Sequence, residues 1–197
     1  MSKLTLHGAK AATAATAKSD IVVVPLFKNE DLSRSSSEIN AAAGDVLQRA
    51  ITIGDADAKL GKITTMVGSG NITRIMSVGC GDRASFNLEA QLSVTGAVSR
   101  ALASSKAKNA IVVGDPIADD KDALTQFLEF LGRDMAMACY HYTATLGTPK
   151  PGPTFSKLTV AVDGISAAKA KQSLSVGATI GNGANLTREL VNFPGHV

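Results

Sequence analysis

The chain alternates between short apolar runs and longer segments in which apolar residues recur every third or fourth position. The short runs are rich in valine and isoleucine, as is typical of strands that are buried on both faces of a sheet. They predict strands at residues 3–8, 20–27, 62–70, 73–81, 109–115 and 156–163.

Helical spacing of the apolar residues marks the longer segments. It predicts helices at residues 35–53, 85–104, 119–142 and 167–192, with the serines at 35–37 as caps of the first helix. Residues 9–18, rich in Ala and Thr, are either a loose helix or a connection. In the last helix, Gly177, Gly181 and Gly183 indicate close packing against a neighbouring element.

Strands and helices alternate along the chain. The strand at 73–81, the helix at 85–104 and the strand at 109–115 form a crossover unit, which implies a parallel pair of strands. The fold class is therefore α/β, with one mixed, mainly parallel sheet and helices on both faces.

The composition fits one globular domain. At 197 residues, with 45% hydrophobic and 19% charged residues, the chain is long enough for a sizeable core. The net charge of +3 is dispersed, so it gives no argument for nucleic acid and leaves weak binding open. The sequence has no run of 18 apolar residues and no signal-peptide pattern, which predicts a cytoplasmic protein. Cys80 and Cys139 each lie in an apolar stretch and are expected to be buried free thiols.

The sharpest local pattern is GCGDRA at Gly79–Ala84, a G-x-G-x-x-A between a predicted strand and a predicted helix. In dinucleotide-binding domains such glycines let the backbone approach a pyrophosphate at a helix N-terminus. Here Asp82 would repel a phosphate, and the next strand ends at Asp115, too far along the chain for the ribose-binding acid. A tight strand-to-helix turn is the favoured interpretation, and nucleotide binding is the alternative.

The remaining polar groups have structural interpretations. The acidic residues Asp115, Asp119, Asp120 and Asp122 have the chemistry of a hard-metal site, but helix capping explains them more simply. The histidines His7, His141 and His196 lack metal-ligand spacing. The lysines Lys157, Lys169 and Lys171 form a modest basic patch that is typical of a solvated face. The residues by themselves predict no catalytic, cofactor-binding or metal-binding site.

The last stretch, GATIGNGANLTRELVNFPGHV at residues 177–197, changes this picture. It resembles the segment of M17-family leucyl aminopeptidases that closes their N-terminal domain and leads into the catalytic domain. The family's Arg-(Asp/Glu)-Leu-Val-Asn-x-Pro run is matched by Arg188, Glu189, Leu190, Val191, Asn192 and Pro194. The resemblance extends upstream to about Lys18, through KSDIVVVPLF, DADAKLGK and RIMSVGCGD.

The resemblance implies a macro-domain-like three-layer α/β sandwich over residues 1–175, with 176–197 as a linker helix and the start of a catalytic domain. In this family two divalent metals, Zn²⁺ or Mn²⁺, are held by Lys, Asp and Glu side chains of the C-terminal domain. No residue of this chain matches those motifs, so no catalytic, cofactor-binding or metal-binding residue is assigned. The parent enzyme would hydrolyse N-terminal amino acids, preferentially Leu, from peptides, and this chain alone is expected to be inactive.

The resemblance also implies partners. They are the chain's own catalytic domain and the further subunits of a homo-hexamer, so the expected role is structural and hexamer-supporting. Two alternatives remain open: a DNA-binding module, as in some bacterial members of the family, and a module on Gly79–Ala84 that binds an ADP-ribose-like nucleotide.

Overall fold

One sheet organises the molecule. In the computed structural model, which describes residues 4–118, 120–145 and 147–193, the described strands lie in the order β1-β6-β5-β2-β4-β3. Their bounds are β1 Thr5–Ala9, β2 Ile21–Phe27, β3 Ile63–Val67, β4 Arg74–Gly81, β5 Asn109–Val113 and β6 Lys157–Ala161. Neighbouring strands are parallel except β3 and β4, which are antiparallel. The predicted mixed, mainly parallel sheet is confirmed.

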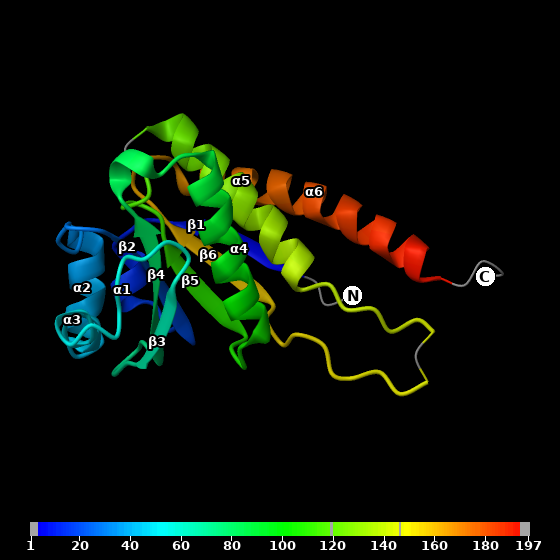
Figure 1. Cartoon of the computed structure of the whole chain (residues 1–197), viewed down its shortest axis with the longest axis horizontal. Helices are drawn as coiled ribbons and strands as arrows, with labels where there is room; N and C mark the ends of the chain where they lie inside the picture. The colour runs from blue at the N-terminus through cyan, green and yellow to red at the C-terminus, as the bar shows by residue number, and fades with distance from the viewer. Residues whose placement is uncertain (1–3, 119, 146, 194–197) are drawn as a thin grey trace.

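Helices cover both faces of this sheet, α1 to α3 on one side and α4 to α6 on the other (Figure 1). Their bounds are α1 Thr13–Thr16, α2 Arg34–Ala42, α3 Val46–Thr52, α4 Leu88–Ser104, α5 Lys121–Ala138 and α6 Ala167–Asn192. The side chains of β2 alternate between the two faces of the sheet and so contribute to the core on each side. Ile21 and Val23 pack into the core under α4, α5 and α6, whereas Val22 and Val24 pack into the core under α2 and α3, because successive side chains point to opposite faces.

The single helix predicted at 35–53 is wrong, because the chain turns between α2 and α3. Gly44 and Asp45 adopt left-handed conformations with φ of 80° and 58°. The side chain of Asn40 holds the junction: its oxygen accepts from the backbone N–H groups of Leu47 and Gln48 at 3.0 and 3.1 Å. These bonds satisfy donors that the start of α3 would otherwise leave unpaired.

The end of the helix predicted at 119–142 is also wrong. Helix α5 ends at Ala138, and the chain then runs outward beside α6 before it returns to β6 (Figure 1). Tyr140 and Tyr142 continue the helical spacing in sequence, but their hydroxyls bond to the far end of α6.

Helices α5 and α6 pack closely along their length. A Cβ atom on Gly177 would overlap the backbone carbonyl of Glu129, and one on Gly181 would lie 2.5 Å from the carbonyl oxygen of Arg133. The close packing predicted for these two glycines is confirmed. The prediction of close packing is wrong for Gly183, because a Cβ atom at this position would have no described atom within 4 Å. Helix α6 crosses the predicted domain boundary at 175/176 without a break.

Candidate functional site

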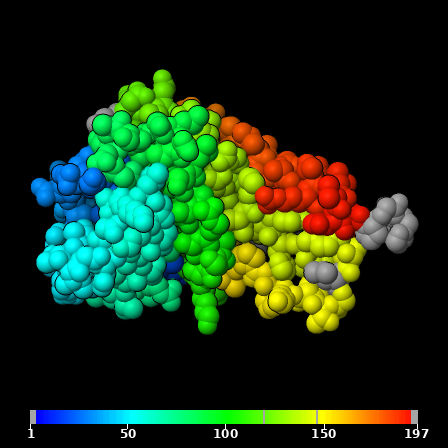
Figure 2. Space-filling model, viewed as in Figure 1, coloured from blue at the N-terminus to red at the C-terminus, as the bar shows by residue number. Residues whose placement is uncertain are grey.

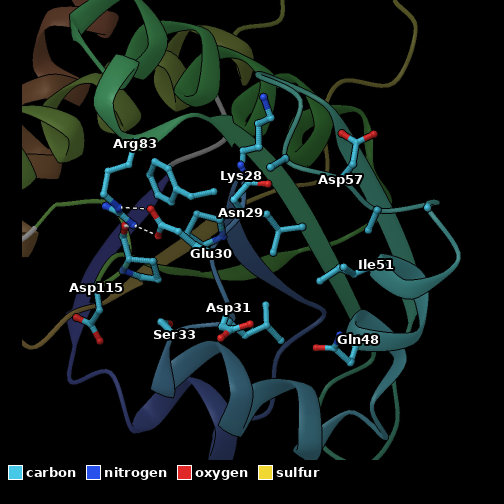
Figure 3. Close-up of a pocket in the computed structure, with 18 residues that line it drawn as sticks. Lys28, Asn29, Glu30, Asp31, Ser33, Gln48, Ile51, Asp57, Arg83 and Asp115 are labelled. Atoms are coloured by element: carbon cyan, nitrogen blue, oxygen red, sulfur yellow. Dashed lines mark hydrogen bonds and ion pairs between the residues drawn. The ribbon is translucent and has the colours of Figure 1, made fainter.

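A cavity of about 690 Å³ lies at the carboxyl ends of β2, β4 and β5. Strand β2 lies between β4 and β5, and the chain crosses over it on the way from β4 to β5. Ligands of open α/β sheets bind at such a reversal of strand order. The walls come from residues 25–33, from α3, from Arg83 and from residues 115–116, together with Gly54, Ala56, Asp57 and Ala58 (Figure 3).

Arg83 ties two of these loops together. Its Nε and Nη2 donate to the two carboxylate oxygens of Glu30 at 2.7 and 2.8 Å, and Nη2 also donates to the carbonyl of Pro116 at 3.0 Å. The guanidinium lies 3.8 Å from the ring centroid of Phe27. The hydrogen bond from Arg83 holds the pKa of Glu30 below its usual value. This part of the wall is therefore fixed by the protein itself.

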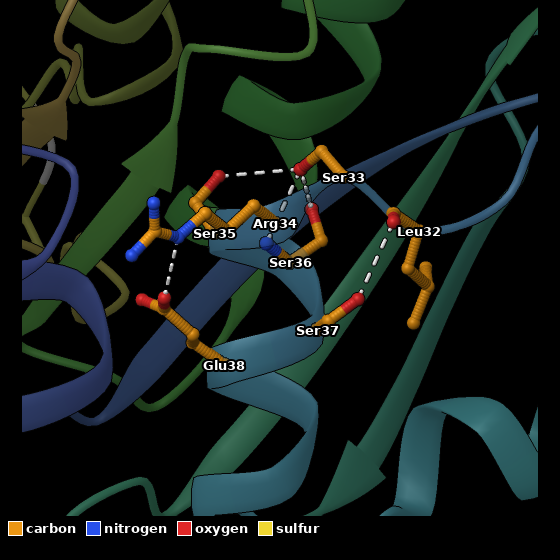
Figure 4. A network of polar contacts seen from close by, with 7 residues as sticks. All are labelled: Leu32, Ser33, Arg34, Ser35, Ser36, Ser37 and Glu38. Atoms are coloured by element: carbon orange, nitrogen blue, oxygen red, sulfur yellow. Dashed lines mark hydrogen bonds and ion pairs between the residues drawn. The ribbon is translucent and has the colours of Figure 1, made fainter.

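The loop after β2 ends in a serine cluster at the start of α2 (Figure 4). Ser33 is the N-cap: its hydroxyl oxygen accepts from the backbone N–H of Ser36 at 3.2 Å and its hydroxyl donates to that of Ser36 at 2.9 Å. Arg34 pairs with Glu38 one turn further on, at 3.1 Å. The cap lies at Ser33 and not within the predicted 35–37, and its hydroxyl stabilises the helix.

Asp31 and Asp115 stand on the same side of the cavity, next to Ser33 (Figure 3). Asp115 is half-buried and accepts a hydrogen bond from the backbone N–H of Asp163 at 2.7 Å. Burial raises the pKa of this carboxyl. Neither carboxylate forms an ion pair with another described residue.

The glycine turn at Gly79–Ala84 packs against residues 58–62. A Cβ on Gly79 would overlap the backbone carbonyl of Lys59. The N–H groups of Gly79 and Gly81 donate to the carbonyls of Lys62 and Ala58, at 2.9 and 2.7 Å. These two N–H groups are therefore engaged within the chain, and the glycines serve a close approach of two backbone segments.

Capping accounts for Asp120, whereas it is wrong for Asp115, which lies in the cavity wall and accepts from the N–H of Asp163 instead. Asp120 is the N-cap and accepts from the N–H of Ala123 at 2.8 Å, and Asp122 lies in the first turn. Asp119 lies outside the described residues. Within residues 4–118, 120–145 and 147–193, no group of three His, Cys, Asp or Glu side chains is placed to hold a metal ion.

The residues that line the cavity include no described histidine and no cysteine. His7 is in β1, His141 bonds to the carbonyl of Lys150 at 2.6 Å, and His196 is outside the described residues. Both cysteines are free, and burial raises the thiol pKa of Cys80 to about 12 and that of Cys139 to about 11. Cys80 is buried as predicted, whereas Cys139 is only partly buried.

The predicted lysines lie on β6 and α6: Lys157 begins β6, and Lys169 and Lys171 lie in the first turns of α6. Lys157 and Lys171 are close enough to His7 to lower its pKa, together with burial, which is the larger cause. Lys169 lines a surface hollow at the start of α6 with Lys10 and Lys121. Among the described residues, no helix is long and apolar enough to cross a membrane.

The last turns of α6 carry polar residues that point back to the segment after α5. Glu189 accepts from the hydroxyl of Tyr140 at 2.8 Å, and the amide of Asn192 donates to the same hydroxyl at 3.4 Å. Arg188 donates to the carbonyl of Met137 at 3.4 Å. The end of α6 is thereby attached to α5 and to the described residues of the segment after α5, which lie beside α6 (Figure 2).

A second surface of α6 is apolar and exposed. It consists of Val176, Ile180, Leu186, Leu190 and Val191, which are between 45% and 78% exposed. Because an α-helix turns by about 100° per residue, these positions fall within an arc of about 140°. The buried positions on the opposite arc, among them Leu174, Gly177 and Gly181, face α5. We call the exposed set the α6 stripe.

The chain belongs to the cytosol aminopeptidase family, whose N-terminal domain model matches residues 23–147. It is 28% identical over 185 residues to a probable cytosol aminopeptidase of Burkholderia ambifaria, covering 92% of this chain and 37% of that protein. The protein of the same description from Burkholderia lata matches with the same identity and coverage. The chain thus spans 37% of the length of these curated relatives.

Solved structures agree on the fold. A mutant of tomato leucine aminopeptidase superposes with a TM-score of 0.72 and 17% identity, over 98% of this chain and 39% of that one. The bottromycin maturation enzyme BotP superposes with a TM-score of 0.62 and 14% identity, over 89% of this chain and 33% of that one. The family predicted from the C-terminal motif is confirmed.

Proposed function

We propose that this chain is the non-catalytic N-terminal part of a metal-dependent leucyl aminopeptidase, and that the α6 stripe packs against the catalytic part of that enzyme. The observation that carries the proposal is the apolar stripe on the side of α6 turned away from α5. Leaving such side chains in water is unfavourable by about 25 cal/mol per Å² of apolar surface. Contiguous apolar surface of this kind typically marks an interaction site.

The contacts of the family motif support this assignment. Arg188 bonds to Met137 in the last turn of α5, and Glu189 and Asn192 bond to Tyr140 in the segment that follows. Its apolar residues Leu190 and Val191 are exposed. The motif therefore fixes the end of α6 on its own domain with one set of side chains and presents the other set to a partner.

A groove next to the stripe offers further surface of the same kind. It has a volume of about 890 Å³ and is lined by α5, α6 and the segment after α5, including Ala136, Tyr140, Ala178 and Asn182. The described lining residues include no Asp, Glu, Lys or Arg. We assign it to the same occupant, the catalytic part, which would make up the remaining length of the enzyme.

In this proposal the chemistry belongs to the catalytic part. Two divalent metals, Zn²⁺ or Mn²⁺, would be held there by Lys, Asp and Glu side chains and would supply Lewis-acid chemistry for peptide hydrolysis. This chain contributes a structural role: it covers the catalytic part and supports a cytoplasmic homo-hexamer that acts on peptides.

The gene beyond codon 197 tests the proposal. We expect the reading frame to continue into a domain that bears Lys, Asp and Glu metal-binding motifs. In that longer protein, Leu186→Glu with Leu190→Glu should lower the melting temperature and weaken assembly. A stop directly after codon 197, or a longer protein that is insensitive to both substitutions, would overturn it.

A second candidate function is DNA binding, and the lysines on and near α6 favour it. Lys10, Lys121 and Lys169 surround a hollow of about 610 Å³ at the start of α6, and Lys157 and Lys171 lie near His7. Phosphate contacts release counterions, so an electrophoretic shift of duplex DNA should weaken steeply between about 50 and 200 mM salt. Replacing Lys10, Lys121 and Lys169 with Gln should abolish it. No shift at low salt would exclude this function.

A further inference from the structure

We infer that the cavity at the carboxyl ends of β2, β4 and β5 binds a small organic cation, a protonated amine or guanidinium carried on an apolar body. This inference goes beyond the proposed function and does not depend on it. It rests on the cavity's position, on the charges in its wall and on the apolar surface between them.

The wall has an excess of negative charge. Its charged residues are four carboxylates, Glu30, Asp31, Asp57 and Asp115, and two cations, Lys28 and Arg83. Arg83 is engaged by Glu30, and Lys28 lies 3.7 Å from Asp82. Asp57 has its own partner, the ammonium of Lys62 at 2.8 Å.

Of the four wall carboxylates, Asp31 and Asp115 form no ion pair with another described residue. They lie on either side of Ser33 in Figure 3, at the same side of the cavity. Asp115 is half-buried, so its charged form is poorly solvated and its pKa is raised. A bound cation would supply the counter-charge that the protein itself does not place there.

The remaining wall suits an apolar body. It is formed by Pro25, Leu26, Leu32, Ile51, Ala58 and Pro116. A volume of about 690 Å³ lies within the usual range for small-molecule sites, roughly 300–1,000 Å³. The cavity is thus large enough for a ligand with both a charged and an apolar end.

The same geometry disfavours a nucleotide. The cap hydroxyl of Ser33 already bonds to the N–H of Ser36 at the start of α2. The N–H groups of Gly79 and Gly81 are taken by backbone carbonyls. A phosphate would therefore meet unpaired carboxylates without these three donors.

Titration of the ¹⁵N-labelled chain with phenethylamine, followed by NMR, tests the inference. We expect saturable shifts of the backbone amides at 28–33 and 115–118. The neutral isostere 2-phenylethanol and ADP-ribose, at the same concentrations, should leave these amides unchanged. The double variant Asp31→Asn with Asp115→Asn should weaken amine binding by about tenfold or more, as expected for loss of charged hydrogen bonds.

Asp55→Asn is the matched control, because it removes the same charge from an exposed residue outside the cavity wall and should leave the affinity unchanged. The single variant Asp31→Asn carries the test if the double variant does not fold, since Asp31 is exposed. Equal binding of the alcohol, binding of ADP-ribose at these amides, no response to millimolar amine, or full affinity in the Asp31→Asn variant would each overturn the inference.

Discussion

The hydroxyl of Tyr140 donates to the carboxylate of Glu189 across 2.8 Å. This bond joins the segment after α5 to the last turn of α6, two places 49 residues apart in the sequence. Asn192 donates to the same hydroxyl from the next turn. The polar residues of the family motif thus bond within this domain. Its exposed apolar residues are free to contact a partner.

Removal of the Tyr140 hydroxyl should loosen the end of α6. In Tyr140→Phe, the amides at 188–192 should exchange with solvent a few-fold faster, because local opening no longer breaks this bond. Hydrogen exchange followed by mass spectrometry measures the effect. Glu189→Gln is the control, since it keeps an acceptor oxygen and should exchange at nearly the original rate. Unchanged exchange in Tyr140→Phe would show that the bond does not hold the helix.

Replacing Gly177 or Gly183 of α6 with alanine should change the free energy of unfolding in opposite directions. Gly177→Ala places a methyl group against the carbonyl of Glu129 and should lower the free energy of unfolding by about 1–3 kcal/mol. Gly183→Ala meets no described atom within 4 Å and should raise it by about 1 kcal/mol through helix propensity. Urea unfolding of both variants compares them directly. Effects of equal sign would contradict the packing of α5 on α6.

The α6 stripe should matter little to the isolated chain. Leu186→Ala and Leu190→Ala remove exposed side chains, so each should change the free energy of unfolding by less than about 0.5 kcal/mol. The fully buried Leu174 is the control, because Leu174→Ala should cost about 2–5 kcal/mol. Large losses in the stripe variants would mean that these residues already pack within this domain.

Asp115 should give stability a measurable pH dependence. Its pKa is raised in the folded state, mainly by burial, so the ionised carboxylate destabilises the fold as pH rises above the ordinary value of 3.8. Asp115→Asn removes this titration and keeps an acceptor for the N–H of Asp163. The variant's stability relative to the original chain should therefore increase as pH rises through that range. A constant difference between pH 3 and pH 7 would rule out a raised pKa.

The layers of the fold could be predicted because they depend on local patterns. The run at 21–24 is apolar at every position, and the structure divides it between two cores. The break between α2 and α3 could not be predicted in this way. It depends on the side chain of Asn40, which bonds to residues seven and eight positions later.

The candidate cavity was also missed at the level of sequence. Its central contact joins Glu30 to Arg83, 53 residues apart, and no spacing rule links them. The glycine pattern at Gly79–Ala84 lies beside the cavity, but it does not indicate the cavity. Its glycines allow close packing on residues 58–62. The motif at 188–192 indicated the family correctly. Only the structure shows that its polar residues bond within the domain while its apolar residues are exposed.

The most direct measurement of the central claim is hydrolysis of L-leucine p-nitroanilide by the purified 197-residue chain, with Mn²⁺ or Zn²⁺, beside the cytosol aminopeptidase relative of Burkholderia ambifaria. We expect the relative to turn over the substrate and this chain to give no rate above the metal-only blank. Metal-dependent turnover by this chain alone would contradict its assignment as a non-catalytic domain.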